Sequence, residues 1–224
     1  MSSTTYTKTY PALPFQERDI LRYAGYRNSN TPDDAMNELL HSCEAMVQGS
    51  LTYRVCWQTL PVRCDQDGVL LGTLSLPSQQ LSKHLAPCTT AVVFAATIGV
   101  AIDRLVSRYS HISPSKALVL QALGAAQIEA LCDAFCADIE AETGLFGVPR
   151  FSPGYGDLAI QTQRDIFALL GCEKRIGLTL NDSLLMSPTK SVTAICGLTE
   201  LPTVHAGHKC ATCPHSTCAY RAQT

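Results

Sequence analysis

Residues 150–199 read RFSPGYGDLAIQTQRDIFALLGCEKRIGLTLNDSLLMSPTKSVTAICGLT and carry more unusual local chemistry than any stretch before them. Arg150 can form paired hydrogen bonds with a carboxylate. The Pro-Gly turn that follows contains Gly154 and Gly156, which permit a positive φ and let backbone amides approach a ligand closely. Tyr155, between them, adds a flat apolar ring with a hydroxyl at its tip. These groups would suit a zwitterionic ligand that carries a ring, and the alternative is a tight surface turn with Arg150 in an ion pair.

The same stretch contains two spaced patterns, Arg-x-x-x-Gly-Tyr and then Met-x-Pro-x-x-Ser-Val, separated by a helix and a strand. Together they resemble the activation domain of cobalamin-dependent methionine synthase. The residues that carry the resemblance are Arg150, Gly154, Tyr155, Met186, Pro188, Ser191 and Val192. The family's full-length enzymes continue after Gly-Tyr with a Cys-Pro-x-His run, which this chain replaces with residues 156–159.

The resemblance implies an S-adenosylmethionine site. In that family this ligand remethylates the cobalamin after its cobalt has been oxidised accidentally. By the resemblance, Arg150 would bind the methionine carboxylate, and Gly154 and Tyr155 would supply backbone and ring contacts. Ser191 is a weaker candidate, and Asp157 could pair with the ammonium or the ribose of the ligand.

Composition places the chain among ordinary globular proteins, with 224 residues, of which 46% are hydrophobic and 16% charged. A net charge of -2 without a basic cluster argues against a nucleic-acid partner. The apolar run at 91–101 is too short for a membrane span, and residues 2–10 lack the apolar core of a secretory signal. We therefore expect a cytoplasmic protein with no membrane partner, whose eleven cysteines are free thiols or metal ligands.

The C-terminal tail is a second centre of chemistry, because Cys210, Cys213 and Cys218 have the spacing C-x2-C-x4-C. Thiolates this close in sequence suit an iron–sulfur cluster or zinc. A fourth ligand would have to come from elsewhere, and the alternative is a loose tail of reduced cysteines. An iron–sulfur cluster would fit corrinoid chemistry, which requires a single low-potential electron.

The pattern of elements predicts an α+β fold, with a mixed, mostly antiparallel sheet packed with helices and no Rossmann phosphate loop. We expect a central strand at 89–97, because it is apolar on both faces. Strands are also expected at 54–62, 68–77, 175–180 and 191–198, the first two joined by an Asp-Gly hairpin. Helices are expected near 17–27, 32–48, 78–85, 100–109, 114–143 and 159–170.

Two details of the helices bear on metal sites. The helix at 32–48 would begin with Thr31 as its cap and Pro32 at its first position. Within it, His41 and Cys43 diverge, which argues against a shared metal. In the long helix, Cys132 and Cys136 lie four residues apart on the inner stripe, where core thiols are favoured over metal ligands.

The chain divides into three predicted parts. Residues 1–30 form an N-terminal arm and short helix, residues 31–200 form the activation-domain-like α+β domain, and residues 201–224 form the cysteine-rich metal-binding tail.

The leading interpretation is an accessory component rather than a complete enzyme. It would bind S-adenosylmethionine and support reductive methylation of cob(II)alamin in a separate methionine synthase or related corrinoid protein, with help from an electron donor. The alternative is a metal-binding redox or scaffold protein whose functional centre is the cysteine tail. A small-molecule methyltransferase would need a general base near Tyr155, and the sequence offers no nearby candidate.

Overall fold

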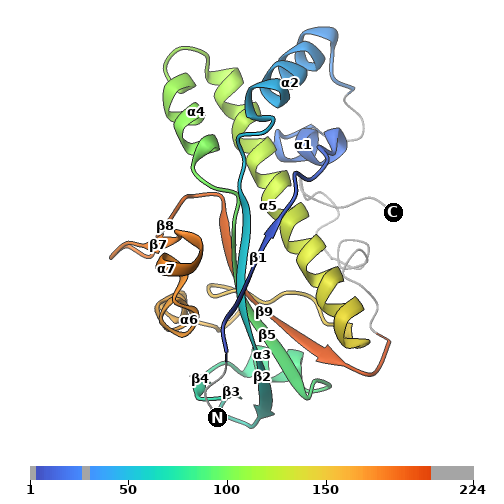
Figure 1. Ribbon diagram of the computed structural model, residues 1–224, viewed down its shortest axis with the longest axis vertical. Helices are drawn as coiled ribbons and strands as arrows, with labels where there is room; N and C mark the ends of the chain where they lie inside the picture. The colour runs from blue at the N-terminus through green and yellow to red at the C-terminus, as the bar shows by residue number, and fades with distance from the viewer. Residues whose placement is uncertain (1–3, 27–30, 203–224) are drawn as a thin grey trace.

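The structure is a computed structural model that describes residues 4–26 and 31–202, and its centre is a seven-stranded sheet with helices on both faces (Figure 1). The strands are β1 (Tyr6–Tyr10), β2 (Tyr53–Cys64), β3 (Val69–Leu71), β4 (Leu74–Leu76), β5 (Thr90–Thr97), β6 (Phe146–Gly147) and β9 (Ser191–Thr199). A separate two-stranded ribbon is made by β7 (Thr179–Leu180) and β8 (Met186–Ser187). The helices are α1 (Glu17–Tyr23), α2 (Asp34–Val47), α3 (Gln79–Leu85), α4 (Ala101–Tyr109), α5 (Pro114–Thr143), α6 (Thr162–Leu170) and α7 (Cys172–Ile176).

The strands follow the order β4-β3-β2-β5-β9-β6, and β1 pairs with β2 off this path. Every pairing within the described residues is antiparallel. The predicted α+β class with a mostly antiparallel sheet is therefore confirmed.

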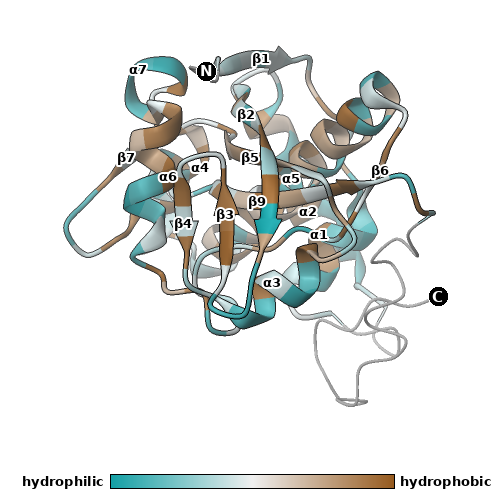
Figure 2. Ribbon diagram, turned by 90° about the horizontal axis from the view of Figure 1, so that it is seen from below, coloured by the Kyte–Doolittle hydropathy of each residue, from teal (hydrophilic) through white to brown (hydrophobic). Residues whose placement is uncertain are grey.

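The central strand β5 lies between two hydrophobic cores. Its residues alternate between them, with Val92, Phe94 and Ala96 in one core and Val93 and Ala95, among others, in the second. The first core is covered by α1, α2, α4 and α5, and the second by α3, α6 and α7. Figure 2 shows hydrophobic residues along β3 and hydrophilic residues on α3. Because β5 is covered on both faces, its residues are apolar without the alternation of a half-exposed strand.

Helix α5 is the longest element and forms one wall of the candidate site. Phe135 on α5 packs against Phe94 of β5 and Trp57 of β2, with ring centroids 4.8 and 5.2 Å apart. At Gly124, a Cβ atom would lie 2.9 Å from the Lys190 side chain and 3.0 Å from Ile102 of α4, so a larger residue would require these side chains to shift. The helix is long and apolar enough to cross a membrane, but 61% of its most hydrophobic window is buried inside the protein, which is typical of a core helix.

The N-terminal segment joins the same sheet and core. β1 pairs with β2 from Tyr6 opposite Trp57 to Tyr10 opposite Tyr53. The Tyr10 hydroxyl also donates a hydrogen bond to Asp138 of α5, at 2.6 Å. The division of the chain near residues 31 and 201 stays a prediction.

Two of the expected local details are wrong. Asp33, and not Thr31, caps α2, because its carboxylate accepts a hydrogen bond from the Met36 amide at 2.8 Å. The run 68–77 is not one strand, since Gly72, with φ +59°, turns it back on itself and divides it into β3 and β4.

The expected strand at 175–180 is reduced to its last two residues, because the segment begins in the last turn of a short helix. Gly171 and Gly177 both adopt left-handed backbone conformations and enclose the single helical segment α7 between them. Only Thr179 and Leu180 are extended, as β7. The two left-handed glycines therefore end a helical turn at Gly177, where the apolar pattern had indicated a strand.

Candidate functional site

A cavity of about 600 Å³ opens between α5, the segment 147–155 and β9. This volume falls in the range of small-molecule sites. Segment 147–155 is held against β9 by a β-bridge, in which Phe151 and Ile195 exchange two backbone hydrogen bonds of 2.9 Å. The Val148 amide adds a third bond, 2.8 Å to the Gly197 carbonyl. Residues that precede the Gly-Tyr turn are thus positioned by sheet pairing.

Helix α5 presents a polar stripe to this cavity. Glu129, Asp133, Cys136 and Glu140 recur at spacings of four, three and four residues, which places them on one helical face. Glu140 accepts a hydrogen bond from the Gly147 amide at 2.8 Å, which ties the helix to β6.

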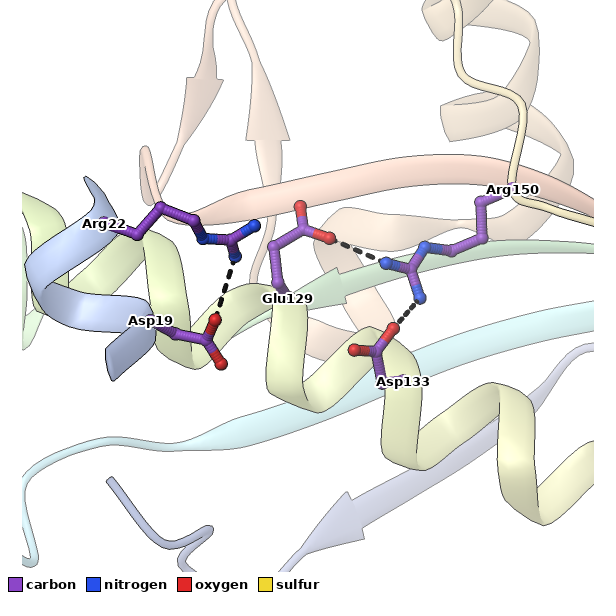
Figure 3. Close-up of polar contacts among 5 residues, drawn as sticks. All are labelled: Asp19, Arg22, Glu129, Asp133 and Arg150. Carbon is purple, nitrogen blue, oxygen red and sulfur yellow. Dashed lines mark hydrogen bonds and ion pairs between the residues drawn. The ribbon is translucent and has the colours of Figure 1, made fainter. Parts of the chain in front are cut away.

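The Arg150 side chain extends toward this stripe and meets Glu129 and Asp133, as Figure 3 shows. Its Nη1 donates to Asp133 Oδ1 at 2.5 Å and its Nη2 donates to Glu129 Oε2 at 2.7 Å. The Arg150 side chain is only 23% exposed. Burial works to lower the pKa of the guanidinium, but the surrounding groups, including Asp133 and Glu129, outweigh it and raise that pKa above its ordinary value.

The turn after Arg150 places Tyr155 at the rim of the cavity. The Tyr155 ring is 60% exposed and meets Phe151 edge-on, with centroids 6.2 Å apart. Gly154 and Gly156 have φ of +91° and +55°, so the turn uses the left-handed freedom that the sequence predicted. At Gly156, a Cβ atom would also lie 2.2 Å from the Gln80 side chain, which leaves no room for a larger residue without movement of Gln80.

Two cysteines complete the wall of the cavity. Cys136 of α5 and Cys196 of β9 are in side-chain contact with each other. The Cys196 thiol lies 3.2 Å from the Val148 carbonyl oxygen and donates a hydrogen bond to it. The contact with Cys196 lowers the pKa of the Cys136 thiol, and Arg150 acts in the same direction against the effect of burial.

No protein-family model matches the chain, and no curated protein matches it. Among solved structures, the chain is similar to a crystal structure of the MetH reactivation domain bound to AdoHcy, with a TM-score of 0.61 and 14% sequence identity, over 89% of this chain and 80% of that chain. The fold is that of the MetH reactivation domain. The resemblance inferred from residues 150–199 is thereby confirmed for the fold.

Within this reactivation-domain fold, the structure brings two of the predicted site residues together at the cavity, Arg150 and Tyr155. Gly154 lies in the same turn but outside the cavity lining. Its amide donates to the Leu158 carbonyl at 2.8 Å. The ion pairs of Arg150 match the alternative that the sequence left open, and all three residues line the cavity.

Asp157 and Ser191 lie elsewhere than at the cavity lining. The Asp157 carboxylate accepts hydrogen bonds from the Ser78 hydroxyl and from the Gln79 amide at 2.9 Å, so it caps α3. These bonds, with the Ser78 contact the largest cause, lower the pKa of Asp157. The buried Ser191 hydroxyl bonds to Thr97 Oγ1 and to the Pro188 carbonyl, both at 2.8 Å. Their contacts position the turn and the start of β9, and their predicted roles in ligand binding stay predictions.

Sequence reasoning missed the carboxylates Glu129 and Asp133. The signal was present, because they lie four residues apart on a helix whose apolar stripe was recognised, and Cys136 and Glu140 continue the same face. Nothing local connected this stripe with Arg150, which follows the helix by several residues.

The predicted metal ligands Cys210, Cys213 and Cys218 lie outside the described residues. Among the residues that the structure does describe, Glu17, His41 and Glu44 bring one potential ligand atom each within 4.8 Å of one another. His41 Nε2 and Glu17 Oε1 lie 3.4 Å apart, and both side chains are largely exposed. This group is separate from the cavity lining.

Proposed function

We propose that the protein binds S-adenosylmethionine and serves as a reactivation component for a cobalamin-dependent methionine synthase or a related corrinoid protein. The observation that carries this proposal is the placement of Arg150 between two carboxylates in a cavity of a reactivation-domain fold. The similar solved structure holds AdoHcy, which is what remains of S-adenosylmethionine after its methyl group has been transferred.

The charges of the cavity match the amino-acid end of this ligand. That end carries a carboxylate and an ammonium, and the cavity offers a guanidinium beside Glu129 and Asp133. A guanidinium has five N–H donors, of which the two ion pairs use two, so Arg150 has the donor capacity to hold a ligand carboxylate as well. The neighbouring carboxylates would receive the ammonium.

The remaining parts of the ligand have matching surfaces too. The exposed ring of Tyr155 can stack on an adenine, and the acidic stripe of α5 favours the positive charge of a sulfonium. When bound, S-adenosylmethionine would supply an electrophilic methyl group to the cobalamin of the partner protein. The residues of this chain bind and orient it, and catalysis then rests on proximity rather than on a base supplied by the chain.

The partner and the compartment belong to the same proposal. The cobalamin comes from the partner, the electron comes from a separate donor, and the complex works in the cytoplasm. The cysteine tail would hold an iron–sulfur cluster or zinc. If the tail alone were the functional centre, the chain would be a metal-binding redox or scaffold protein instead.

Calorimetric titration of the full chain with S-adenosylmethionine and AdoHcy tests the binding step. We expect one site for each ligand, and competition between the two ligands. A coupled assay with a cobalamin protein and a reductant should then show methylation that depends on the chain. A folded protein that binds neither ligand would contradict the proposal.

A further inference from the structure

The two cysteines of the cavity wall come from elements distant in sequence, Cys136 from α5 and Cys196 from β9. Their side chains touch, and Cys196 is 5% exposed whereas Cys136 is partly exposed toward the cavity. Both residues line the cavity, and Cys136 is the more exposed of the two.

The two thiols also differ in acidity. Contact with Cys196 lowers the pKa of Cys136, with Arg150 also favouring the thiolate, while contact with Cys136 and burial raise the pKa of Cys196. An accessible thiol with a low pKa is the attacking partner in thiol–disulfide exchange, and a second thiol in contact with it can resolve the mixed disulfide once it has lost its proton.

A second pair, Cys56 and Cys172, provides a contrast. These thiols also touch, but they lie in the second hydrophobic core with exposures of 0% and 1%. A soluble oxidant has no access to them while the protein is folded. Of these two pairs, Cys136 and Cys196 therefore combine side-chain contact and a difference in thiol pKa with access for a soluble oxidant.

We propose that Cys136 and Cys196 form a redox-active dithiol, which a low-molecular-weight disulfide such as oxidised glutathione converts to an intramolecular disulfide that weakens ligand binding in the cavity. The effect on ligand binding rests on the proposed function of this cavity, whereas the dithiol itself does not.

The exchange proceeds by ordinary thiol chemistry. The Cys136 thiolate attacks one sulfur of the reagent, the S–S bond of the reagent breaks, and one thiol leaves. Cys196 then loses its proton to solvent and attacks the Cys136 sulfur, which releases the second thiol. Two protein thiols lose two electrons, and one reagent disulfide is reduced to two thiols.

The disulfide would change the shape and the charge of the cavity. An S–S bond is about 2.05 Å long, so two sulfurs in non-bonded contact must move closer together, and α5 is drawn toward β9. The Cys136 thiolate, which Arg150 stabilises, is lost at the same time. Because coupling is reciprocal, a ligand that prefers the reduced cavity should also protect the pair from oxidation.

The test uses the full chain treated with oxidised glutathione, with and without AdoHcy, followed by alkylation, trypsin and peptide mass mapping. We expect a linked pair of peptides, 117–150 with 191–209, which contain Cys136 and Cys196. AdoHcy should slow its formation. Cys132, in the same peptide, is fully buried, so Cys132→Ala should keep the link and Cys136→Ser should abolish it. Fragmentation of the wild-type linked peptide locates the bond even where a variant fails to fold.

A second experiment measures the affinity of the wild-type protein for AdoHcy before oxidation, after oxidation and after reduction with dithiothreitol. We expect oxidation to weaken binding by about 5- to 150-fold, the usual span of coupling between sites, and reduction to restore it. If both thiols stay reduced while the exposed Cys64 reacts, the dithiol is overturned. A disulfide with unchanged affinity overturns the regulatory effect. A disulfide in a protein whose reduced form never binds AdoHcy supports the dithiol and contradicts only the proposed function.

Discussion

Replacing Arg150 with alanine separates the ligand role of this residue from its structural role. Arg150 makes two charged hydrogen bonds to α5, and its side chain is 23% exposed. The partners are more open to solvent, with Glu129 42% and Asp133 72% exposed. The change therefore removes two partly screened ion pairs and one candidate ligand contact together.

The expected loss of stability is small. Ion pairs with exposed partners contribute about 0.2 to 1 kcal/mol each. Without Arg150, Glu129 and Asp133 remain four residues apart as like charges, which costs about 0.2 to 0.5 kcal/mol more. We expect the free energy of unfolding to fall by about 1 to 2 kcal/mol, so the variant should stay folded.

The expected loss of affinity is larger. A hydrogen bond to a charged group contributes about 1.5 to 3 kcal/mol, which corresponds to a roughly 10- to 150-fold increase in Kd. Arg150→Lys should recover only part of the affinity, because an ammonium cannot reproduce the planar fork.

Isothermal titration with AdoHcy at 25 °C measures the affinity, and urea unfolding measures the stability. Arg164→Ala is a matched control, because Arg164 donates to the Asp182 carbonyl at 3.0 Å and lies outside the cavity lining. We expect this control to bind AdoHcy as the wild type does. An Arg150→Ala protein that is folded and binds with unchanged affinity would refute the assignment of Arg150 to the ligand.

Three further predictions concern the rim, the turn and the tail. Tyr155→Leu should weaken AdoHcy binding by about 0.5 to 1.5 kcal/mol and change the free energy of unfolding by no more than about 0.5 kcal/mol, because the ring is 60% exposed. A collapse of thermal stability with intact binding would make Tyr155 a packing residue. Asp157→Ala should lower the midpoint of thermal unfolding at pH 7, since its carboxylate caps α3. The Ser78 and backbone hydrogen bonds lower the pKa of Asp157 below its ordinary 3.8, so the difference from wild type should persist above pH 3.8 and shrink as the pH falls through the lowered value. A difference that does not depend on pH in this range would exclude the carboxylate as its source. Protein made anaerobically with iron should contain iron and sulfide, and serine at Cys210, Cys213 and Cys218 together should remove both while AdoHcy binding survives. Zinc instead of iron would leave a structural role, and free alkylation of all three thiols in the native protein would reject the metal centre.

Local sequence determined much of the fold. The run 89–97 was apolar on both faces and became β5 between two cores. The long periodic segment became α5 with the expected bounds, Pro114–Thr143. Periodicity succeeds here because burial on both faces of a strand, or on one stripe of a helix, is set by residues that are close in sequence.

Left-handed glycines limited the same reasoning. The run 68–77 and the segment 175–180 both looked extended. Gly72 divides the first into β3 and β4, and Gly177 separates the end of α7 from β7 in the second. A glycine permits a positive φ but does not require it, so the sequence alone could not fix where the chain would turn.

For the site, the sequence determined the turn and its chemistry, while tertiary contacts decided how each residue is used. The Arg-x-x-x-Gly-Tyr pattern selected Arg150 and Tyr155, and both line the cavity. Asp157 came from the same turn but caps α3, because folding brings the first amides of that helix to its carboxylate. The contact between Cys136 and Cys196 likewise exists only after α5 packs against β9. Such contacts join residues distant in the chain, and their geometry is set by the packing of whole elements rather than by local pattern.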